Sequence, residues 1–206
     1  MTKIETEEQL RAIYGPPIEI AVAKCLVALD RHCKRFIELA PFAVISSANA
    51  NGDADVSPRG DGPGFVKVLD DKTILMPDRP GNKRVDTLSN VLENPKVGML
   101  FFVPGMNETL RINGTAEIHT TTEFMDLFAD TPKPPITVIK VRIDEVFLHC
   151  AKSLMRSRLW DVNAQIDRKM LPTLGKMVKD QTAVNIEVGT QEETDQYFAA
   201  SIAERG

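Results

Sequence analysis

This chain of 206 residues lacks a basic excess, a long apolar run and paired cysteines. Its net charge of −4 at pH 7 leaves no broad cationic surface to neutralise phosphodiesters, so nucleic acid is not expected as a partner. No apolar run approaches the roughly 18 residues that span a bilayer. The first five residues lack the pattern of a secretory signal. These absences favour a cytoplasmic protein that does not enter membranes.

Recognisable catalytic and metal-binding patterns are also missing. The three cysteines, Cys25, Cys33 and Cys150, form no C-x-x-C pair, so reduced thiols are expected and zinc is not. The sequence contains no H-E-x-x-H, no paired carboxylates and no set typical of a Ser-His-Asp triad. It therefore assigns no catalytic residue, which is typical of a protein whose cofactor carries the reactive chemistry.

The periodicity of apolar residues predicts an α+β fold, mainly β with helical ends. A capping box at Thr6 and Gln9 predicts a short first helix, and a longer helix is expected over 18–39. Strands are expected at 42–47, 54–59, 65–68, 73–76, 97–103 and 109–118, with one or two more between 136 and 150. A helix is expected from Val85, and C-terminal helices over 159–178 and 192–202. Short turns between successive strands indicate an antiparallel barrel. We expect one domain over 1–206, with N-terminal helices (1–40), a barrel (41–150) and a helical end (151–206).

The segment from Pro77 to Arg84 holds three cations, an amide and a Pro-Gly turn. It lies between a predicted strand and a predicted helix, and a helix start offers unpaired N–H groups and a positive dipole end. Lys83 and Arg84, with Arg79 upstream, therefore indicate a phosphate site. A solvated basic turn that binds nothing explains the same residues about equally well.

Two further segments suit a planar, anionic ligand. Residues 57–64 contain G-x-G-x-G beside Arg59, which leaves room for close approach to the backbone. The strand expected next excludes a Rossmann turn. In residues 149–160, Lys152, Arg156 and Trp160 would share one helical face. The alternatives are a glycine-rich connection without a ligand and a solvated cationic face with the tryptophan in the core.

Together these segments resemble the FMN-binding split-barrel superfamily of pyridoxamine 5′-phosphate oxidase, and more closely a branch of FMN-dependent enzymes within it. The matching stretches are 57–61, 77–84, Asn94-Pro95, 110–114 and 149–160. The resemblance implies a six-stranded antiparallel split β-barrel and a homodimer that binds FMN between its subunits.

The resemblance also assigns roles to residues. It implies that Asn82, Lys83 and Arg84 hold the FMN phosphate together with Arg59. It implies that Met76, Pro77 and Thr109 lie at the isoalloxazine ring, and that residues 152–160 reach the flavin of the partner subunit. The full set of candidate cofactor contacts is Arg59, Asp61, Met76, Pro77, Asp78, Arg79, Asn82, Lys83, Arg84, Thr109, Arg111, Lys152, Arg156, Ser157 and Trp160.

The chain after Trp160 departs from the oxidase, because it is predicted to be helical and lacks the oxidase's C-terminal substrate-binding pattern. Oxidation of pyridoxamine phosphate is therefore not predicted. The predicted function is an FMN-binding oxidoreductase that acts on an unidentified small-molecule substrate or electron donor or acceptor. One alternative is a flavin carrier, sensor or electron-transfer partner without turnover. The other is a barrel that holds haem or deazaflavin F420.

Overall fold

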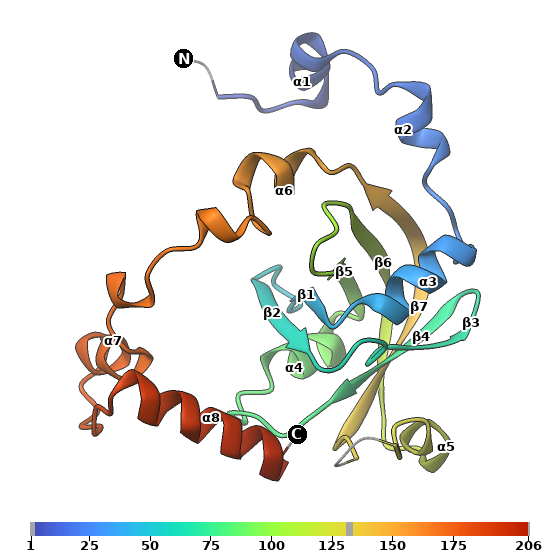
Figure 1. Cartoon of the computed structure of the whole chain (residues 1–206). Coiled ribbons are helices and arrows are strands. Elements are labelled where there is room, and N and C mark those ends of the chain that lie inside the picture. Colours follow the sequence, from blue (N-terminus) through green and yellow to red (C-terminus); the bar gives the residue numbers. More distant parts are fainter. Residues whose placement is uncertain (1–2, 131–133, 206) are drawn as a thin grey trace.

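The computed structural model describes residues 3–130 and 134–205, and a seven-stranded antiparallel sheet forms its core (Figure 1). The strands are β1 (Phe42–Ala48), β2 (Ala54–Gly60), β3 (Lys67–Asp70), β4 (Thr73–Asp78), β5 (Lys96–Phe102), β6 (Thr109–His119) and β7 (Thr137–His149). Their order is β2-β1-β5-β6-β7-β4-β3. The predicted antiparallel, mainly β fold with helices is confirmed.

The sheet is consistent with the predicted split barrel, but the predicted count of six strands is corrected and the sheet does not close. The sheet has seven strands, because residues 67–70 pair with β4 as a separate strand and residues 137–149 form one long strand. β2 and β3 stand at the two ends of the strand order, and the described residues pair neither with the other. The sheet is therefore open along that seam.

Along most strands, every second side chain is buried, so one face of the sheet packs into the core. β6 places Leu110, Ile112 and Ala116 in the main core, while intervening residues are less buried. β4 is buried on both faces, because Met76 belongs to the main core and Leu75 packs with Phe128 in a second cluster. α5 (Thr122–Asp126) lies on that second side.

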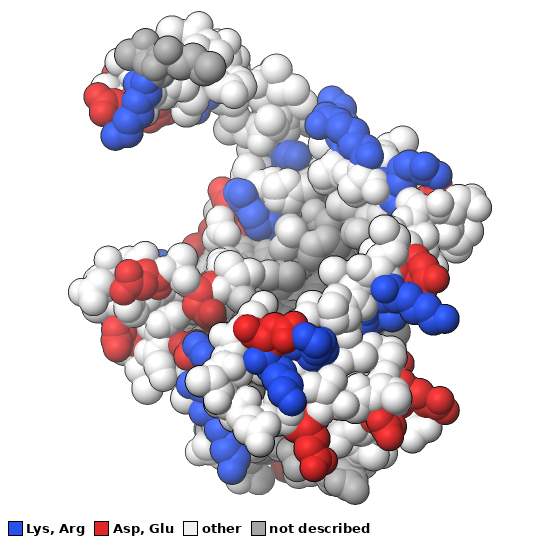
Figure 2. Space-filling view, turned by 90° about the vertical axis from the view of Figure 1, so that its left-hand side faces the viewer, with Lys and Arg blue, Asp and Glu red and all other residues white. Residues whose placement is uncertain are grey.

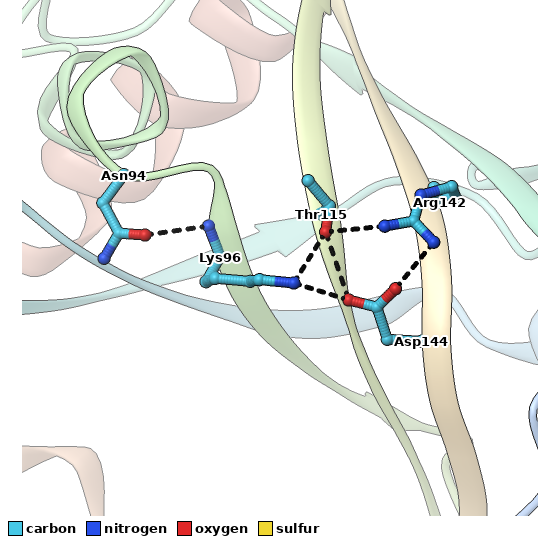
Figure 3. Close-up of polar contacts among 5 residues, drawn as sticks. All are labelled: Asn94, Lys96, Thr115, Arg142 and Asp144. Carbon is cyan, nitrogen blue, oxygen red and sulfur yellow. Dashed lines mark hydrogen bonds and ion pairs between the residues drawn. The ribbon is translucent and has the colours of Figure 1, made fainter.

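A bulge fixes the register of the long β6–β7 ribbon. The pairing shifts between Asn113 and Gly114, and it leaves Asp144 without a partner residue on β6. The Asp144 carboxylate lies 2.9 Å from Lys96 Nζ and 2.9 Å from Arg142 Nη1 (Figure 3). Thr115 donates its hydroxyl to the same carboxylate at 3.1 Å. One acidic side chain thus joins β5, β6 and β7 at the bulge.

Two further helices pack on the sheet. α3 (Arg31–Leu39) begins at Asp30, whose carboxylate accepts a hydrogen bond from the Cys33 N–H at 2.8 Å. It buries Cys33, Phe36 and Ile37 in the core, and burial raises the pKa of the Cys33 thiol to about 11. This thiol is therefore protonated at neutral pH and serves packing. α4 (Asp86–Glu93) buries Thr87 and Val91.

The N-terminal helices are shorter than predicted. α1 (Glu7–Tyr14) begins at Thr6, whose hydroxyl accepts from the Gln9 N–H as expected. The single helix expected over 18–39 is wrong, since only α2 (Glu19–Ala23) and α3 are helical there. Between them, the backbone of Leu26 exchanges two hydrogen bonds of 2.9 Å with Val146 on β7. This long-range pairing replaces the helical hydrogen bonds at that point.

The C-terminal end is also divided. α6 (Lys152–Ser157) follows β7, and the helix predicted over 159–178 is replaced by single turns at Val162–Ala164 and Arg168–Met170. The carboxylates of Asp161 and Asp167 cap these turns. α7 (Leu174–Gln181) begins after Pro172, and α8 (Gln191–Arg205) confirms the last predicted helix. Among the described residues, no helix has the length and apolar character needed to cross a membrane.

Candidate functional site

A pocket of about 540 Å³ lies between β2, the β4–α4 connection and the start of α4. Its lining brings together six of the predicted contacts: Arg59, Asp78, Arg79, Asn82, Lys83 and Arg84. The segments 57–59 and 78–84, which are separate in sequence, thus meet around one cavity.

The turn before α4 has a constrained backbone. Lys83 and Val85 adopt left-handed conformations, with φ of 63° and 54°, which are uncommon for residues other than glycine. The Asn82 side chain accepts a hydrogen bond from the Arg84 N–H at 3.0 Å and holds the turn. Val85 occupies the N-cap position of α4 and provides no side-chain cap. The first N–H groups of α4 therefore lack the acceptor that a capping side chain would give.

Arg59 is a largely enclosed cation of the pocket, with 23% of its side chain exposed. Its Nη1 donates to Ser57 Oγ at 2.6 Å, and its Nη2 lies 3.6 Å from Asp78 Oδ1. Its Nε is buried and has no hydrogen-bond partner in the described part of the chain. A buried donor without an acceptor is costly, so this atom fits an anionic ligand. Burial raises the pKa of the Asp78 carboxyl, and the Arg59 charge offsets only part of that rise.

Arg79 is held by the glycine-rich segment. Its Nε donates to Asp61 Oδ2 at 2.8 Å, and its Nη2 lies 2.7 Å from the same oxygen. An adjoining hollow of about 240 Å³ is lined by both residues and by Pro77. The structure thus joins Asp61 to the 77–84 turn, and a carboxylate of the chain already engages this arginine.

Arg84 and Lys83 differ in their partners. Arg84 Nε forms an exposed ion pair of 2.7 Å with Asp86, at the start of α4. The Lys83 ammonium forms no hydrogen bond or ion pair with any residue that the structure describes. The pocket is therefore not purely cationic, because Asp55, Asp78 and Asp86 line it as well. Sequence analysis missed Asp55 and Ser57, although alternation along β2 places them on the same face as Arg59.

Met76 does not line the pocket. Its side chain is fully buried in the main core, so only the strand that carries it borders the site. Pro77 is buried and borders the smaller hollow. The expected contact of the Met76 side chain with a flavin ring is thus not provided by this conformation.

The remaining candidates form a second group near the start of β6 and at α6. Its members are Thr109, Arg111, Lys152, Arg156, Ser157 and Trp160. Thr109 is buried and pairs with His149. Arg111 Nη2 lies 2.9 Å from Glu145 Oε1, and its guanidinium lies 4.0 Å from the centre of the Phe147 ring. None of these residues lines the pocket at α4.

The α6 part of this group is exposed. Lys152 and Arg156 point their charges to solvent, while Ser157 donates to the Leu154 carbonyl at 3.1 Å. Trp160 donates its indole N–H to the Met106 carbonyl at 2.7 Å and does not enter the core. Within one chain, the structure therefore places the predicted contacts in two separate groups.

Comparison with known proteins gives one extended match. Residues 29–150 match the family profile described as pyridoxamine 5′-phosphate oxidase, which is more than half of the chain and includes every residue that lines the pocket. No curated protein matches the chain.

Solved structures show weaker similarity. HupZ of Group A Streptococcus is 20% identical with a TM-score of 0.49, over 58% of this chain and 93% of that one. General Stress Protein 26 of Bacillus anthracis is 16% identical with a TM-score of 0.42, over 57% and 93%. The FAD binding protein of Mycobacterium smegmatis is 12% identical with a TM-score of 0.43, over 60% and 97%.

Proposed function

The chain belongs to the pyridoxamine 5′-phosphate oxidase family, and we propose that it is an FMN-dependent oxidoreductase whose flavin phosphate binds in the pocket beside α4. The observation that carries this proposal is the convergence of three unsatisfied donors on one cavity: the buried Nε of Arg59, the ammonium of Lys83, and the uncapped start of α4. A phosphate monoester carries a charge of about −1.5 to −2 and three acceptor oxygens, which matches this donor set.

The carboxylates of the pocket do not prevent this binding. The Arg84–Asp86 pair is exposed, so it is worth only about 0–1 kcal/mol and can open. A phosphate offers Arg84 charge-assisted hydrogen bonds that are roughly twice as strong as neutral ones. Arg59 lines the same pocket, and its contact with Ser57 holds the guanidinium beside it. Asn82 acts indirectly, because it fixes the turn that carries Lys83 and Arg84.

When bound, FMN supplies hydride or single-electron transfer at its ring. The chain's own residues bind the phosphate, orient the coenzyme and set the charge around it. Asp78, whose pKa is raised, accepts a proton more readily than an exposed aspartate does. We place the second group, which includes Arg111 and Trp160, at the flavin of the partner subunit in a homodimer, because this group lies outside the pocket of its own chain.

A double substitution tests the phosphate site. Lys83→Ala combined with Arg84→Ala should weaken FMN binding by about 2–4 kcal/mol, the worth of two charge-assisted contacts. Titration followed by quenching of flavin fluorescence measures this change, and riboflavin, which lacks the phosphate, should show almost none. Lys72→Ala, which removes an exposed cation at the β3–β4 turn, is the matched control.

The result can contradict the proposal in two ways. Unchanged FMN affinity in the double variant would remove the assignment of the phosphate site. A purified protein that carries no flavin and takes up no added FMN would remove the flavin altogether. An absorbance spectrum of haem or F420 in such a protein would instead support one of those ligands. Arg84→Lys should also weaken FMN binding if the contact is bidentate.

One observation favours a flavin-binding protein without turnover. The described residues that line the pocket include no histidine, cysteine or tyrosine, so the usual proton donors other than carboxylates are missing there. Reduction by NADH or NADPH, followed by reoxidation with oxygen or quinones, separates the two functions. Rapid cycling with any donor would exclude a simple carrier.

A further inference from the structure

Polar side chains of α4 attach this helix to the β1–β2 hairpin, and they recur at every third residue, so they lie along one stripe of the helix. Thr87 donates its hydroxyl to the Asp55 carboxylate on β2 at 3.2 Å. Asn90 donates its side-chain N–H to Ser47 Oγ on β1 at 3.0 Å. We call these contacts and the next one along the stripe the α4 seam, formed by Thr87, Asn90 and Glu93 with Asp55, Ser47 and Ala50.

The first two contacts of the seam are enclosed, whereas the third is exposed. Thr87 and Ser47 are only 3% and 6% exposed. At the other end of α4, the Glu93 carboxylate accepts a hydrogen bond of 3.1 Å from the N–H of Ala50, in the turn of the hairpin. A buried hydroxyl without a partner is costly, so the enclosed contacts restrict where α4 can lie.

Apolar packing holds α4 less firmly. The helix buries one apolar side chain, Val91, and Leu88 is partly buried against the same core. Val85 and Leu92 remain 52% and 79% exposed. A helix of eight residues is also too short to be stable by itself in water. Apolar contacts have no preferred direction, whereas hydrogen bonds do, so the seam determines how α4 is placed on the sheet.

The seam reaches the pocket through Asp55 and Thr87, which both line it. A hydrogen bond and the charge of Asp86 raise the pKa of the Arg84 guanidinium, and the charge of Asp55 adds to this rise. Asp55 therefore acts on a cation that we assign to the phosphate. The Thr87 hydroxyl occupies one oxygen of Asp55. Without this hydroxyl, the carboxylate is free to turn toward the cations of the pocket.

The position of each donor matters because the pocket has little excess of positive charge. Four cations and three carboxylates line it. Figure 2 shows the same mixture on one face of the molecule, where cations and carboxylates lie next to one another. A phosphate is therefore held by donors at set distances and not by a broad positive field. The N–H groups at the start of α4 and the cations before it have to stay aligned with each other.

We propose that the α4 seam positions the start of α4 for the phosphate, and that Thr87 also keeps the Asp55 carboxylate from the cations of the pocket. This inference rests on the proposed function, since it deepens the assignment of the phosphate site. Thr87 acts through α4 and Asp55, so it is a positioning residue and not a ligand of the phosphate.

Hydrogen–deuterium exchange of the flavin-free chain tests the placement of α4. Thr87→Val removes the hydroxyl and keeps the shape of the side chain, and it should speed exchange of the amides of residues 89–93 about tenfold. Thr87→Ser keeps the hydroxyl and should exchange at nearly the wild-type rate. Ser89→Ala is the matched control, because this exposed hydroxyl of α4 has no hydrogen-bond partner in the described part of the chain. Exchange in Thr87→Val as slow as in the control would overturn the inference.

Flavin titration tests the consequence for the phosphate. Thr87→Val should raise the dissociation constant of FMN about tenfold and leave that of riboflavin almost unchanged, whereas Thr87→Ser should bind FMN like the wild type. Asn90→Ala should have a smaller effect in the same direction, because this residue acts one turn further from the pocket. An equal loss of FMN and riboflavin affinity would indicate general structural damage and would contradict the positioning role.

The outcomes separate this inference from the proposed function. Equal FMN affinity in the wild type and in Thr87→Val would contradict only the positioning role. A wild-type protein that takes up no FMN would contradict the proposed function, and inorganic phosphate then replaces FMN as the probe, followed by NMR shifts of the amides of residues 82–88. Weaker phosphate binding by Thr87→Val than by Thr87→Ser would still support the inference. Equal phosphate binding by the two variants, or none by the wild type, would overturn it.

Discussion

The sheet with its packed helices differs from the two terminal segments, residues 3–28 and 155–203, in how apolar side chains are buried. Between residues 29 and 150, alternating apolar side chains are buried in a common core, and Phe101, Ile112 and Ile139 are fully excluded from solvent. In the terminal segments, side chains of the same apolar types remain at the surface. Apolar content alone therefore does not separate the two regions, since what differs is the presence of a partner surface.

The candidate contacts divide along a similar boundary. The pocket at α4 is built wholly from residues of the sheet, its connections and α4, so its donors are placed by the core. Lys152, Arg156 and Trp160 lie beyond β7, at the start of the chain's C-terminal end. The comparison teaches that the core of one chain places the donors of the α4 pocket, whereas Lys152, Arg156 and Trp160 lie outside that core.

The largest effect should come from the core. Phe101→Ala should lower the free energy of unfolding by about 3–5 kcal/mol, because it leaves a cavity in close-packed surroundings. Phe198→Ala removes the same ring from the C-terminal segment, where 44% of the residue is exposed. Its cost should stay within about 0.5 kcal/mol.

Urea unfolding measures both variants. A large cost of Phe198→Ala would break the comparison. It would mean that the C-terminal segment packs on its own sheet.

A smaller effect is expected inside the pocket. Asp78→Asn removes the charge that lies 3.6 Å from Arg59, so FMN should bind about tenfold more tightly, or ~1.4 kcal/mol. Asp86→Asn should have less effect, because the Arg84–Asp86 pair is exposed and screened. Flavin titration at fixed pH measures both. If Asp78→Asn weakens FMN binding, Asp78 holds Arg59 in its binding position and does not compete with the phosphate for it.

Much of the sheet could be predicted from the sequence, because a period of two is a local signal. The strands at 42–48 and 109–119 are predicted by their sequence pattern, and the structure shows alternating burial along them. The cap at Thr6 is predicted by its spacing to Gln9. The break at Leu26 could not be predicted, since the helical pattern runs through it and the competing hydrogen bonds come from Val146. A long-range partner overrides local periodicity in a way that the local pattern does not show.

The candidate site was predictable in its cations but not in its ion pairs. The turn chemistry of Pro80-Gly81 and the charges of Lys83 and Arg84 indicate an anion site by local sequence alone. The pairing of Arg79 with Asp61 depends on bringing two connections together, which only the folded sheet does. The same holds for the buried Nε of Arg59, because burial is a property of the whole fold.

The smallest effect should appear at His149, where the sheet meets the C-terminal end. Burial lowers the pKa of its imidazole below 6.5, and the charges of Arg111 and Lys24 add to this shift. Near pH 6.5 the unfolded chain therefore binds a proton more readily than the folded chain does. The contribution of the neutral His149 to the free energy of unfolding is fully present above pH 6.5, and it is lost as the pH falls from there through the lower pKa of the folded state. His149→Gln should reduce the fall in melting temperature between about pH 7.5 and about pH 5.5. His32→Gln, an exposed histidine on α3, is the control. An equal fall in the wild type and in His149→Gln would show that burial does not lower the pKa of this imidazole.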